Sequence, residues 1–278
     1  MSIQAVIQAI GGLALFVYGV NALSAGMQQL AGARLRPLLS RVISHRFAGL
    51  VGGIGITFLL QSSSASTVLY VSMVEGKIIA FSDTIALILG AMIGTTLTVQ
   101  LIAFNISDYA LLAVAAGVVV QIAARHEQTK KAGMMCVGIG LLFFGMSVMK
   151  EGVAPMRDSA VFAAWFRQTI QHPWLAFLLA AAFTACVQAS AATLATVFAF
   201  AAAGMLGTST EEIVRHGLPF VFGANVGTTV TAFLAAIHTG RDAVRVAVAH
   251  SVMKLASTCA FMFLIGPLAS LTLTVTSS

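Results

Sequence analysis

Charged residues are scarce in this sequence. Asp, Glu, Lys and Arg make up 9% of its 278 residues, hydrophobic residues make up 59%, and the mean hydropathy is +0.96. A soluble domain is about one quarter charged. The scarcity excludes an ordinary soluble domain, and we expect a multi-pass protein of the plasma membrane or the cell inner membrane.

Cysteine is also rare. Cys136, Cys186 and Cys259 stand apart in apolar stretches and form no CxxC or Cys/His spacing, which excludes the common zinc and redox motifs. The net charge of +6 is better explained by basic cytoplasmic loops than by a nucleic-acid partner, so we expect none. The apolar start lacks a basic segment, and we therefore expect no cleaved signal peptide.

Long apolar stretches fill most of the chain. Six of them suit one crossing each, since a helix needs about 20 residues to span the bilayer. The stretches 47–74 and 173–206 are too long, because 47–74 as one helix would extend about 42 Å at 1.5 Å per residue, against a core of about 30 Å. Both are predicted to be re-entrant hairpins of two half-helices. The eight stretches are 4–30, 47–74, 83–104, 108–124, 132–149, 173–206, 213–237 and 245–270.

The basic residues favour this topology. With two hairpins, ten Lys and Arg residues fall on cytoplasmic connectors and four on the outer side, as the positive-inside rule requires. If both stretches crossed the membrane, Arg125, Lys130 and Lys131 would lie outside. The amphipathic segments 34–46 and 156–170 are expected to lie in the membrane interface.

The sequence also repeats itself. "GAMIGTTLT" at 90–98 matches "GANVGTTVT" at 223–231 at six of nine positions. "TFLLQSSSAST" at 57–67 aligns with "TACVQASAATL" at 184–194, and "GLALFVYG" at 12–19 aligns with "GIGLLFFG" at 138–145. Because an odd number of crossings separates equivalent points, the repeats should be inverted. We therefore predict an all-α fold forming a single transmembrane domain, 1–278, with about six crossings, two hairpins, two interfacial helices and inverted repeats 1–127 and 128–278.

The polar run Gln61–Ser64 lies at the centre of the first hairpin. A hairpin tip presents the N-terminus of its second half-helix, where backbone N–H groups and the helix dipole attract phosphate or sulfate. Hydroxyls add donors, and Gln offers both a donor and an acceptor. Neither tip contains a carboxylate, which argues against an amine or sugar substrate. Small polar residues also serve helix packing, which is the alternative for single serines.

The two glycine–threonine stretches suit a cation. In "GANVGTT", Gly223 and Gly227 would allow the backbone to unwind and free its carbonyl oxygens for Na+. Close packing of helices through the same glycines is the alternative. The candidate Na+ ligands are Ser66, Thr95, Thr96, Thr193, Asn225, Thr228 and Thr229.

Taken together, these motifs resemble those of the type II sodium-dependent phosphate cotransporters. The resemblance rests on "QSSS" at 61–64, "QASA" at 188–191 and the paired Gly–Thr stretches. It implies a Na+-coupled phosphate symporter that works by alternating access, with two hairpins that meet at midmembrane. Sodium would be the only metal that the protein binds, and no organic cofactor is expected. The phosphate ligands that it implies are Gln61, Ser62, Ser63, Ser64, Gln188 and Ser190.

The chain departs from the family pattern at the second tip and at the first Gly–Thr stretch. Ala189 and Ala191 stand where serines are usual, and Met92 stands where the second stretch has Asn225. These departures leave open weaker binding, a different number of Na+ ions or another anion. Some bacterial members carry a soluble domain after the membrane part, and whether one is missing from this chain stays open.

Lys254 lies well inside the last apolar stretch. It could snorkel to the cytoplasmic face, balance the charge of the anion, or stand where a Na+ would otherwise bind.

Other functions remain open from the residues alone. One is a passive anion channel, and another is a transporter of a different oxyanion or of an organophosphate. A third is an intramembrane hydrolase with a Ser63–Lys254 pair, which the absence of a G-x-S-x-G motif disfavours. The oligomeric state is open, a homodimer included.

Overall fold

The computed structural model describes residues 3–31, 45–103 and 107–276, and every element in these ranges is helical. The chain divides into two compact units. Unit 1 comprises residues 1–16, 145–228 and 253–278, and unit 2 comprises residues 17–144 and 229–252. Three helices contribute to both units, so each unit is described by itself: α1 (Ile3–Ala31), α7 (Glu127–Val153) and α13 (Arg241–Met262). The predicted repeats 1–127 and 128–278 follow the chain instead, and they stay a prediction.

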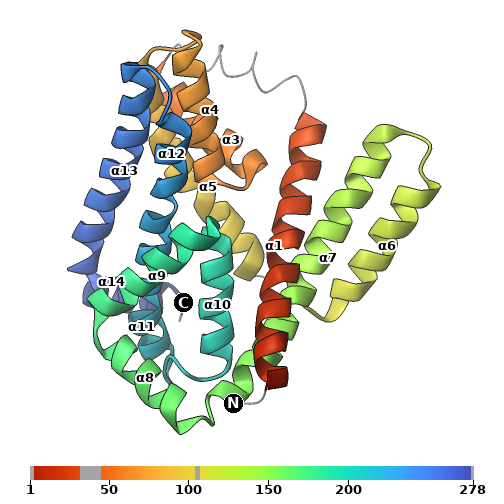
Figure 1. Ribbon diagram of the computed structural model, residues 1–278, viewed down its shortest axis with the longest axis vertical. Coiled ribbons are helices and arrows are strands. Elements are labelled where there is room, and N and C mark those ends of the chain that lie inside the picture. The colour runs from red at the N-terminus through yellow and green to blue at the C-terminus, as the bar shows by residue number, and fades with distance from the viewer. Residues whose placement is uncertain (1–2, 32–44, 104–106, 277–278) are drawn as a thin grey trace. The chain divides into compact units, whose positions relative to one another are not determined.

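Unit 2 holds the first predicted hairpin (Figure 1). The hairpin consists of α3 and α4, and α5 packs along α3. The elements that lie wholly in this unit are α3 (Arg46–Leu60), α4 (Ser63–Glu75), α5 (Phe81–Ala103), the 3-10 turn η2 (Ser107–Tyr109), α6 (Ala110–Ala123) and α12 (Thr229–Ala236).

Unit 1 holds the second predicted hairpin, drawn in green in Figure 1. The hairpin consists of α9 and α10, and α11 packs against both helices. The elements that lie wholly in this unit are the 3-10 turn η3 (Ala154–Met156), α8 (Ala160–Gln171), α9 (Pro173–Val187), α10 (Ser190–Ala202), α11 (Thr210–Gly227) and α14 (Ile265–Thr276).

The helix lengths and compositions fit a multi-pass membrane protein. Within the described ranges, four stretches are long and apolar enough to cross a bilayer: Ile3–Leu30, Phe81–Gln100, Glu127–Met156 and Thr210–Ala236. Three bent helix pairs also pass this test, so that up to seven spans are available if each bent pair counts as one span. The stretch predicted at 108–124 forms only the shorter apolar helix Ser107–Ala123.

The stretch 245–270, predicted as a single crossing, forms a bent helix pair, which fits either one broken span or a re-entrant loop. The chain forms α13 and α14 there, and the two helices are bent by 79° at the break between Met262 and Ile265. Pro267 accounts for the break, because a proline has no N–H to donate to the carbonyl four residues earlier and its ring clashes with that carbonyl. Pro267 lies in the first turn of α14, where its missing N–H costs no intrahelical hydrogen bond.

Close glycine contacts fix α5 onto α3 in unit 2 and α11 onto α9 in unit 1. A methyl group added at Gly90 would lie 2.1 Å from the carbonyl oxygen of Leu50, and one added at Gly223 would lie 2.1 Å from that of Phe177. The second glycine of each motif makes the same kind of contact, Gly94 with the Ile54 oxygen and Gly227 with that of Ala181. Backbones approach this closely only where a side chain is missing. Each Gly-xxx-Gly pair thus holds its helix against the first half of a hairpin.

The amphipathic segments have different outcomes. Most of 34–46 lies outside the described residues. The segment 156–170 forms α8, in which Phe166 is buried whereas Val161 is 83% exposed and Trp165 is 51% exposed. The apolar face predicted for α8 is therefore only partly packed against protein, and its remaining side chains suit contact with lipid.

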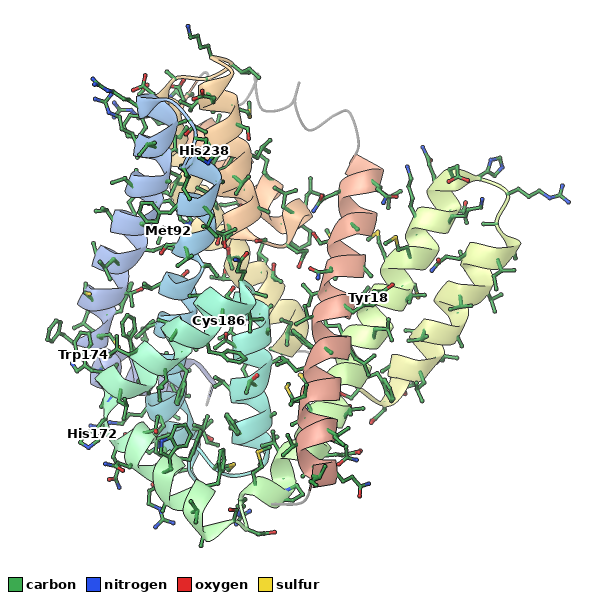
Figure 2. All side chains as sticks on the ribbon, in the orientation of Figure 1. Tyr18, Met92, His172, Trp174, Cys186 and His238 are labelled. Atoms are coloured by element: carbon green, nitrogen blue, oxygen red, sulfur yellow. The ribbon has the colours of Figure 1, made fainter. Side chains whose placement is uncertain are left out.

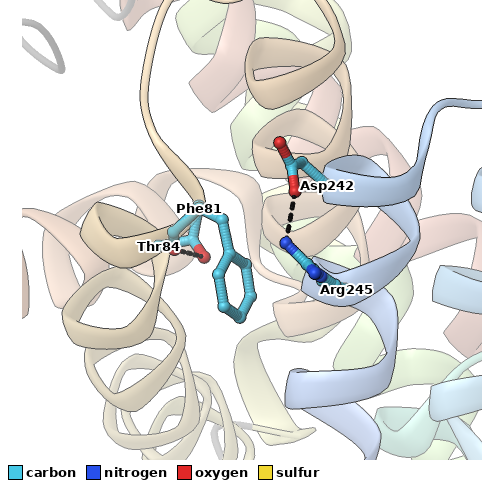
Figure 3. Close-up of polar contacts among 4 residues, drawn as sticks. All are labelled: Phe81, Thr84, Asp242 and Arg245. Atoms are coloured by element: carbon cyan, nitrogen blue, oxygen red, sulfur yellow. Dashed lines mark hydrogen bonds and ion pairs between the residues drawn. The ribbon is translucent and has the colours of Figure 1, made fainter.

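Polar contacts stabilise the first turns of α5 and α13 in unit 2 (Figure 3). Arg245 and Asp242 form an ion pair of 2.7 Å in the first turn of α13, and the Thr84 hydroxyl donates to the Phe81 carbonyl in the first turn of α5. The Glu75 carboxylate accepts the N–H of Gly240 at 2.7 Å and so connects the end of α4 with the segment before α13. These contacts hold the ends of the helices that carry the first tip and its neighbours.

Candidate functional site

The first tip is the break between α3 and α4. Gln61 ends α3 in the left-handed conformation, with φ 54° and ψ 19°, and Ser62 is extended. The two helices are bent by 119° at this point. Such a bend fits either a broken span or the re-entrant hairpin that the sequence predicts for 47–74.

Hydroxyl groups surround the start of α4. Ser62 caps this helix, and its side chain accepts the N–H of Ala65 at 3.2 Å. Ser63 and Ser64 occupy the first two helical positions and are 4% and 3% exposed. The first amides of a helix have no intrahelical carbonyl to bind, so buried hydroxyls and N–H groups gather at one place.

The end of α3 is also satisfied within unit 2. The Ser24 hydroxyl of α1 donates to the Leu60 carbonyl at 2.7 Å, and Gln28 donates to the Ser24 hydroxyl at 2.8 Å. Neither residue was predicted to belong to the site. Polar residues at i and i+4 within the first apolar stretch were the available signal, since these positions share a helix face.

Gln61 is 6% exposed and its amide has a defined orientation. Its Nε2 donates to the Phe58 carbonyl at 2.6 Å, and the opposite orientation would place two oxygens against each other. Its Oε1 is buried and has no hydrogen-bond partner in the part of the chain that the structure describes. The first tip therefore holds a buried acceptor beside its hydroxyl donors, and the cost of leaving such a group unpaired favours a ligand or water that donates to it.

A buried hydroxyl network continues behind the tip. The Thr57 and Ser66 hydroxyls are hydrogen-bonded at 2.8 Å, and Ser66 also donates to the Ser62 carbonyl at 3.0 Å. The Thr67 hydroxyl lies 2.9 Å from Nδ1 of His250, which is fully buried in α13. His250 was not predicted to belong to the site, because Thr67 and His250 are 183 residues apart in the chain.

The second tip has the same backbone conformation. Gln188 ends α9 with φ 57° and ψ 21°, and Ala189 is extended before α10 starts at Ser190. Thr184 and Thr193 form a hydrogen bond of 2.5 Å, at the positions that align with Thr57 and Ser66.

The side chains of the second tip differ from those of the first. Ala189 provides no side-chain cap, Gln188 is exposed and Ser190 is half-buried. Cys186, which is labelled in Figure 2, lies in the last turn of α9 and is also exposed. The second tip offers fewer side-chain donors than the first.

The two Gly–Thr stretches differ in their backbones. The first lies inside the continuous helix α5, where Thr95 donates to the Ala91 carbonyl at 2.9 Å and Thr96 donates to that of Ile93 at 2.6 Å. Met92 is labelled on this helix in Figure 2. In the second stretch the helix is interrupted: α11 ends at Gly227, Thr228 caps it and α12 starts at Thr229. The break in the second stretch is one residue long, and Thr228 keeps right-handed helical dihedrals there, φ -68° and ψ -11°, so the unwinding that would free carbonyl oxygens for Na+ stays a prediction.

Lys254 is buried beside this interruption, with 1% of its surface exposed. Its Nζ donates to the Thr228 hydroxyl at 2.8 Å, and that hydroxyl donates to the Asn225 carbonyl at 2.8 Å. The buried contact with Thr228 disfavours the snorkelling alternative, and the role of Lys254 stays a prediction. A lysine at the centre of a membrane helix costs about 2.5–3.5 kcal/mol on insertion scales, which such contacts offset.

The remaining metal-binding residue types form no further site in the described ranges. No group of three or more His, Cys, Asp or Glu residues is placed there to hold a metal ion. Cys136, Cys186 and Cys259 are free thiols, and the Cys136 thiol donates to the Ala113 carbonyl at 3.3 Å. The polar groups described above therefore carry the candidate site.

Comparison with known proteins gives several relatives. A "Putative inorganic phosphate export protein YjbB" of Salmonella typhimurium is 28% identical over 262 residues, which are 94% of this chain and 47% of the relative. The "Uncharacterized protein YqeW" of Bacillus subtilis is 27% identical over 239 residues, 86% of this chain and 76% of that protein. The "Sodium-dependent phosphate transport protein 2A" of Rattus norvegicus is 40% identical over 97 residues, 34% of this chain and 15% of that protein.

The chain spans about half the length of the YjbB relatives that it matches. No solved structure matches it. The family model described as "Na+/Pi-cotransporter" matches residues 15–151 and 154–275, which is nearly the whole sequence. This multi-pass membrane protein belongs to the Na+/Pi-cotransporter family, a family of transporters and not of enzymes.

Proposed function

We propose that this protein is a Na+-coupled inorganic phosphate symporter that works by alternating access around a midmembrane anion site. Its phosphate ligands are Gln61, Ser62, Ser63, Ser64, Gln188 and Ser190. The observation that carries the proposal is the first tip, where an uncharged helix start gathers buried hydroxyls and a buried acceptor. An anion at such a start gains about 0.3–1 kcal/mol from the helix dipole, and up to about 2 kcal/mol when partly buried.

The acceptor at the first tip favours phosphate over sulfate. Phosphate near neutral pH still carries at least one P–O–H group, whereas sulfate carries no hydrogen. The Gln61 Oε1 accepts from that hydroxyl, while Ser63, Ser64 and the first amides of α4 donate to the remaining oxygens. Sulfate would leave the Oε1 unsatisfied, at a cost of about 1–3 kcal/mol.

Sodium serves as the coupling ion. Its proposed ligands are hydroxyl and amide oxygens, which are hard donors without a fixed charge: Ser66, Thr95, Thr96, Thr193, Asn225, Thr228 and Thr229. Binding of Na+ before phosphate reduces the cost of bringing a doubly charged anion into a low-dielectric site. The names of the family model and of the rat relative support this coupling ion.

Export of phosphate is a second candidate direction. It is favoured by the printed name of the Salmonella relative, whose similarity covers 94% of this chain. Reversing the imposed Na+ gradient across the same vesicles measures the direction in which phosphate follows Na+.

The test is uptake of radiolabelled phosphate into proteoliposomes under an inward Na+ gradient and under an equal K+ gradient. We expect uptake with Na+ alone, and loss of most of that uptake in Ser63→Ala. The matched control is Ser72→Ala on the same helix, because Ser72 is exposed and its hydroxyl donates to the Val68 carbonyl. Equal uptake under both gradients would favour a passive anion channel, and transport of sulfate or an organophosphate in place of phosphate would assign another anion.

A further inference from the structure

Four helices of unit 1 enclose an apolar cleft, to which α8, α9, α10 and α11 all contribute residues. Its volume is about 350 Å³, within the range of about 300–1,000 Å³ that is usual for ligand sites. Trp165 and Phe183 are 51% and 37% exposed, so the cleft is open at the surface. The aromatic residues that line it are Phe162, Trp165, Phe166, Phe183, Phe200 and Phe220.

The threonine hydroxyls at this cleft are hydrogen-bonded within the protein. Thr169 and Thr196 each donate to the carbonyl four residues earlier, at 3.1 Å and 2.9 Å. The hydroxyl of Thr193 is hydrogen-bonded to that of Thr184. A polar ligand would lose its hydration in the cleft with little compensation, so the cleft suits a hydrocarbon chain better.

A second, basic pocket of about 280 Å³ adjoins the cleft at Phe166, which lines both. The residues of α8 that line the cleft are Phe162, Trp165, Phe166 and Thr169, and those that line the pocket are Ala163, Phe166, Arg167 and Ile170. Each set has the spacing i, i+3, i+4, i+7 of one helix face, and the two sets are one residue apart. The cleft and the pocket therefore lie along neighbouring faces of α8.

Two arginines give the pocket its positive charge, Arg157 and Arg167. Neither forms an ion pair within the described ranges, and both are exposed. Arg157 donates to the Ala203 carbonyl at 3.4 Å, which uses one of the five N–H donors of its guanidinium. None of the described residues that line the pocket or the cleft is a carboxylate. The pocket is complementary to an anion, and guanidinium groups bind phosphate groups well.

We propose that α8 carries a binding site for one anionic phospholipid, with an acyl chain in the aromatic cleft and the phosphate on Arg157 and Arg167. A single amphiphile meets both requirements, because its charged group is joined to its chain as the pocket is joined to the cleft at Phe166. The partly exposed Trp165 suits the membrane interface, where lipid headgroups lie. The lipid would also contact α10, the second half of the second hairpin. The proposal goes beyond phosphate transport and is tested without it.

Trp165 can report on this site, because the sequence has one other tryptophan, Trp174. The full-length Trp174→Phe variant is reconstituted in phosphatidylcholine vesicles that contain a small fraction of brominated phosphatidylglycerol or of brominated phosphatidylcholine. Bromine on an acyl chain quenches tryptophan fluorescence on contact. We expect the brominated phosphatidylglycerol to quench Trp165 at a mole fraction about tenfold or more lower than the brominated phosphatidylcholine, as two arginines near an anionic lipid would favour it.

Matched variants locate the effect. Trp165→Phe leaves Trp174, which is labelled in Figure 2 and lines neither the cleft nor the pocket, and the two lipids should quench it equally. In the Trp174→Phe background, the double variant Arg157→Gln, Arg167→Gln should lose the preference for phosphatidylglycerol. Arg215→Gln removes an exposed positive charge of α11 that lies outside the pocket and should keep the preference.

Competitors separate a lipid from a free anion. Unlabelled phosphatidylglycerol should relieve the quenching, whereas inorganic phosphate and glycerophosphoglycerol, which carry the anion without the chain, should not. Relief by inorganic phosphate would assign the pocket to a free anion and overturn the proposal. Equal quenching by the two brominated lipids would also overturn it, and this comparison needs no arginine variant, so it decides even if the double variant does not fold.

Discussion

The two hairpin tips share one backbone conformation but carry different side chains. Gln61 and Gln188 adopt the same left-handed conformation, and each tip has a hydrogen-bonded pair of hydroxyls at equivalent positions behind it. Yet the first tip is capped by Ser62 and buried, whereas the second has Ala189 and an exposed glutamine. The comparison teaches that equivalent helix breaks and glycine contacts accompany the same tip geometry, while serine-to-alanine differences change the number of side-chain donors that each tip offers.

The largest expected effect is a loss of stability from substitutions at the close glycine contacts, which both units contain. Gly90→Ala and Gly223→Ala each force a methyl group against a backbone oxygen, and each should destabilise the protein by about 3 kcal/mol or abolish folding. The matched control is Gly55→Ala, where a methyl group meets no atom within 4 Å and a small gain in stability is expected. Thermal unfolding in detergent measures all three. Tolerance of either Gly90→Ala or Gly223→Ala would show that the equivalent contacts do not carry equal weight.

The next largest effect is on phosphate affinity, which we expect to depend more on the first tip than on the second. Ser63→Ala removes a buried donor from the first tip, and a hydrogen bond to a charged group contributes about 1.5–3 kcal/mol. We therefore expect phosphate affinity to fall about tenfold or more. Ser190→Ala at the second tip should lower it about threefold or less, because Ser190 is only half-buried. Phosphate titrations of both variants test the asymmetry, and equal losses would contradict it.

The smallest effect is a reciprocal exchange of the caps. Ser62→Ala removes the acceptor for the Ala65 N–H and should cost about 1 kcal/mol, the usual value of an N-terminal cap. Ala189→Ser installs the missing cap on α10 and should stabilise the protein by up to about 1 kcal/mol. Unfolding midpoints of the two variants should therefore shift in opposite directions. A shift in the same direction would mean that the tips do not share the cap geometry.

The sequence predicted much of this architecture because the relevant signals are local. The polar run Gln61–Ser64, inside an apolar stretch too long for one crossing, predicted a break there, and the Gly–Thr stretches had two recognised interpretations. Both stretches pack closely against a neighbouring helix, and the second also contains a one-residue break between two helices. Pro267 was a local signal too, and it marks the break between α13 and α14 that the apolar pattern concealed.

The missing parts depend on contacts between residues far apart in the chain. No spacing rule connects Thr67 with His250 or Ser24 with the end of α3. The environment of Lys254 was also out of reach, because the side chain is long enough to reach either the membrane interface or a buried oxygen. Only the position of Thr228 decides between them.

The measurement that tests the central claim most directly is equilibrium binding of radiolabelled phosphate to the purified protein, with unlabelled phosphate and unlabelled sulfate as competitors. It should be made in Na+ and in K+, for the wild type, Ser63→Ala and Ser72→Ala. We expect phosphate binding that depends on Na+ and is displaced by unlabelled phosphate but not by sulfate. Ser63→Ala should weaken this binding about tenfold or more, and Ser72→Ala should leave it unchanged. Binding that is equal in both cations, or equal in Ser63→Ala and the wild type, would contradict the claim that the first tip is a Na+-coupled phosphate site.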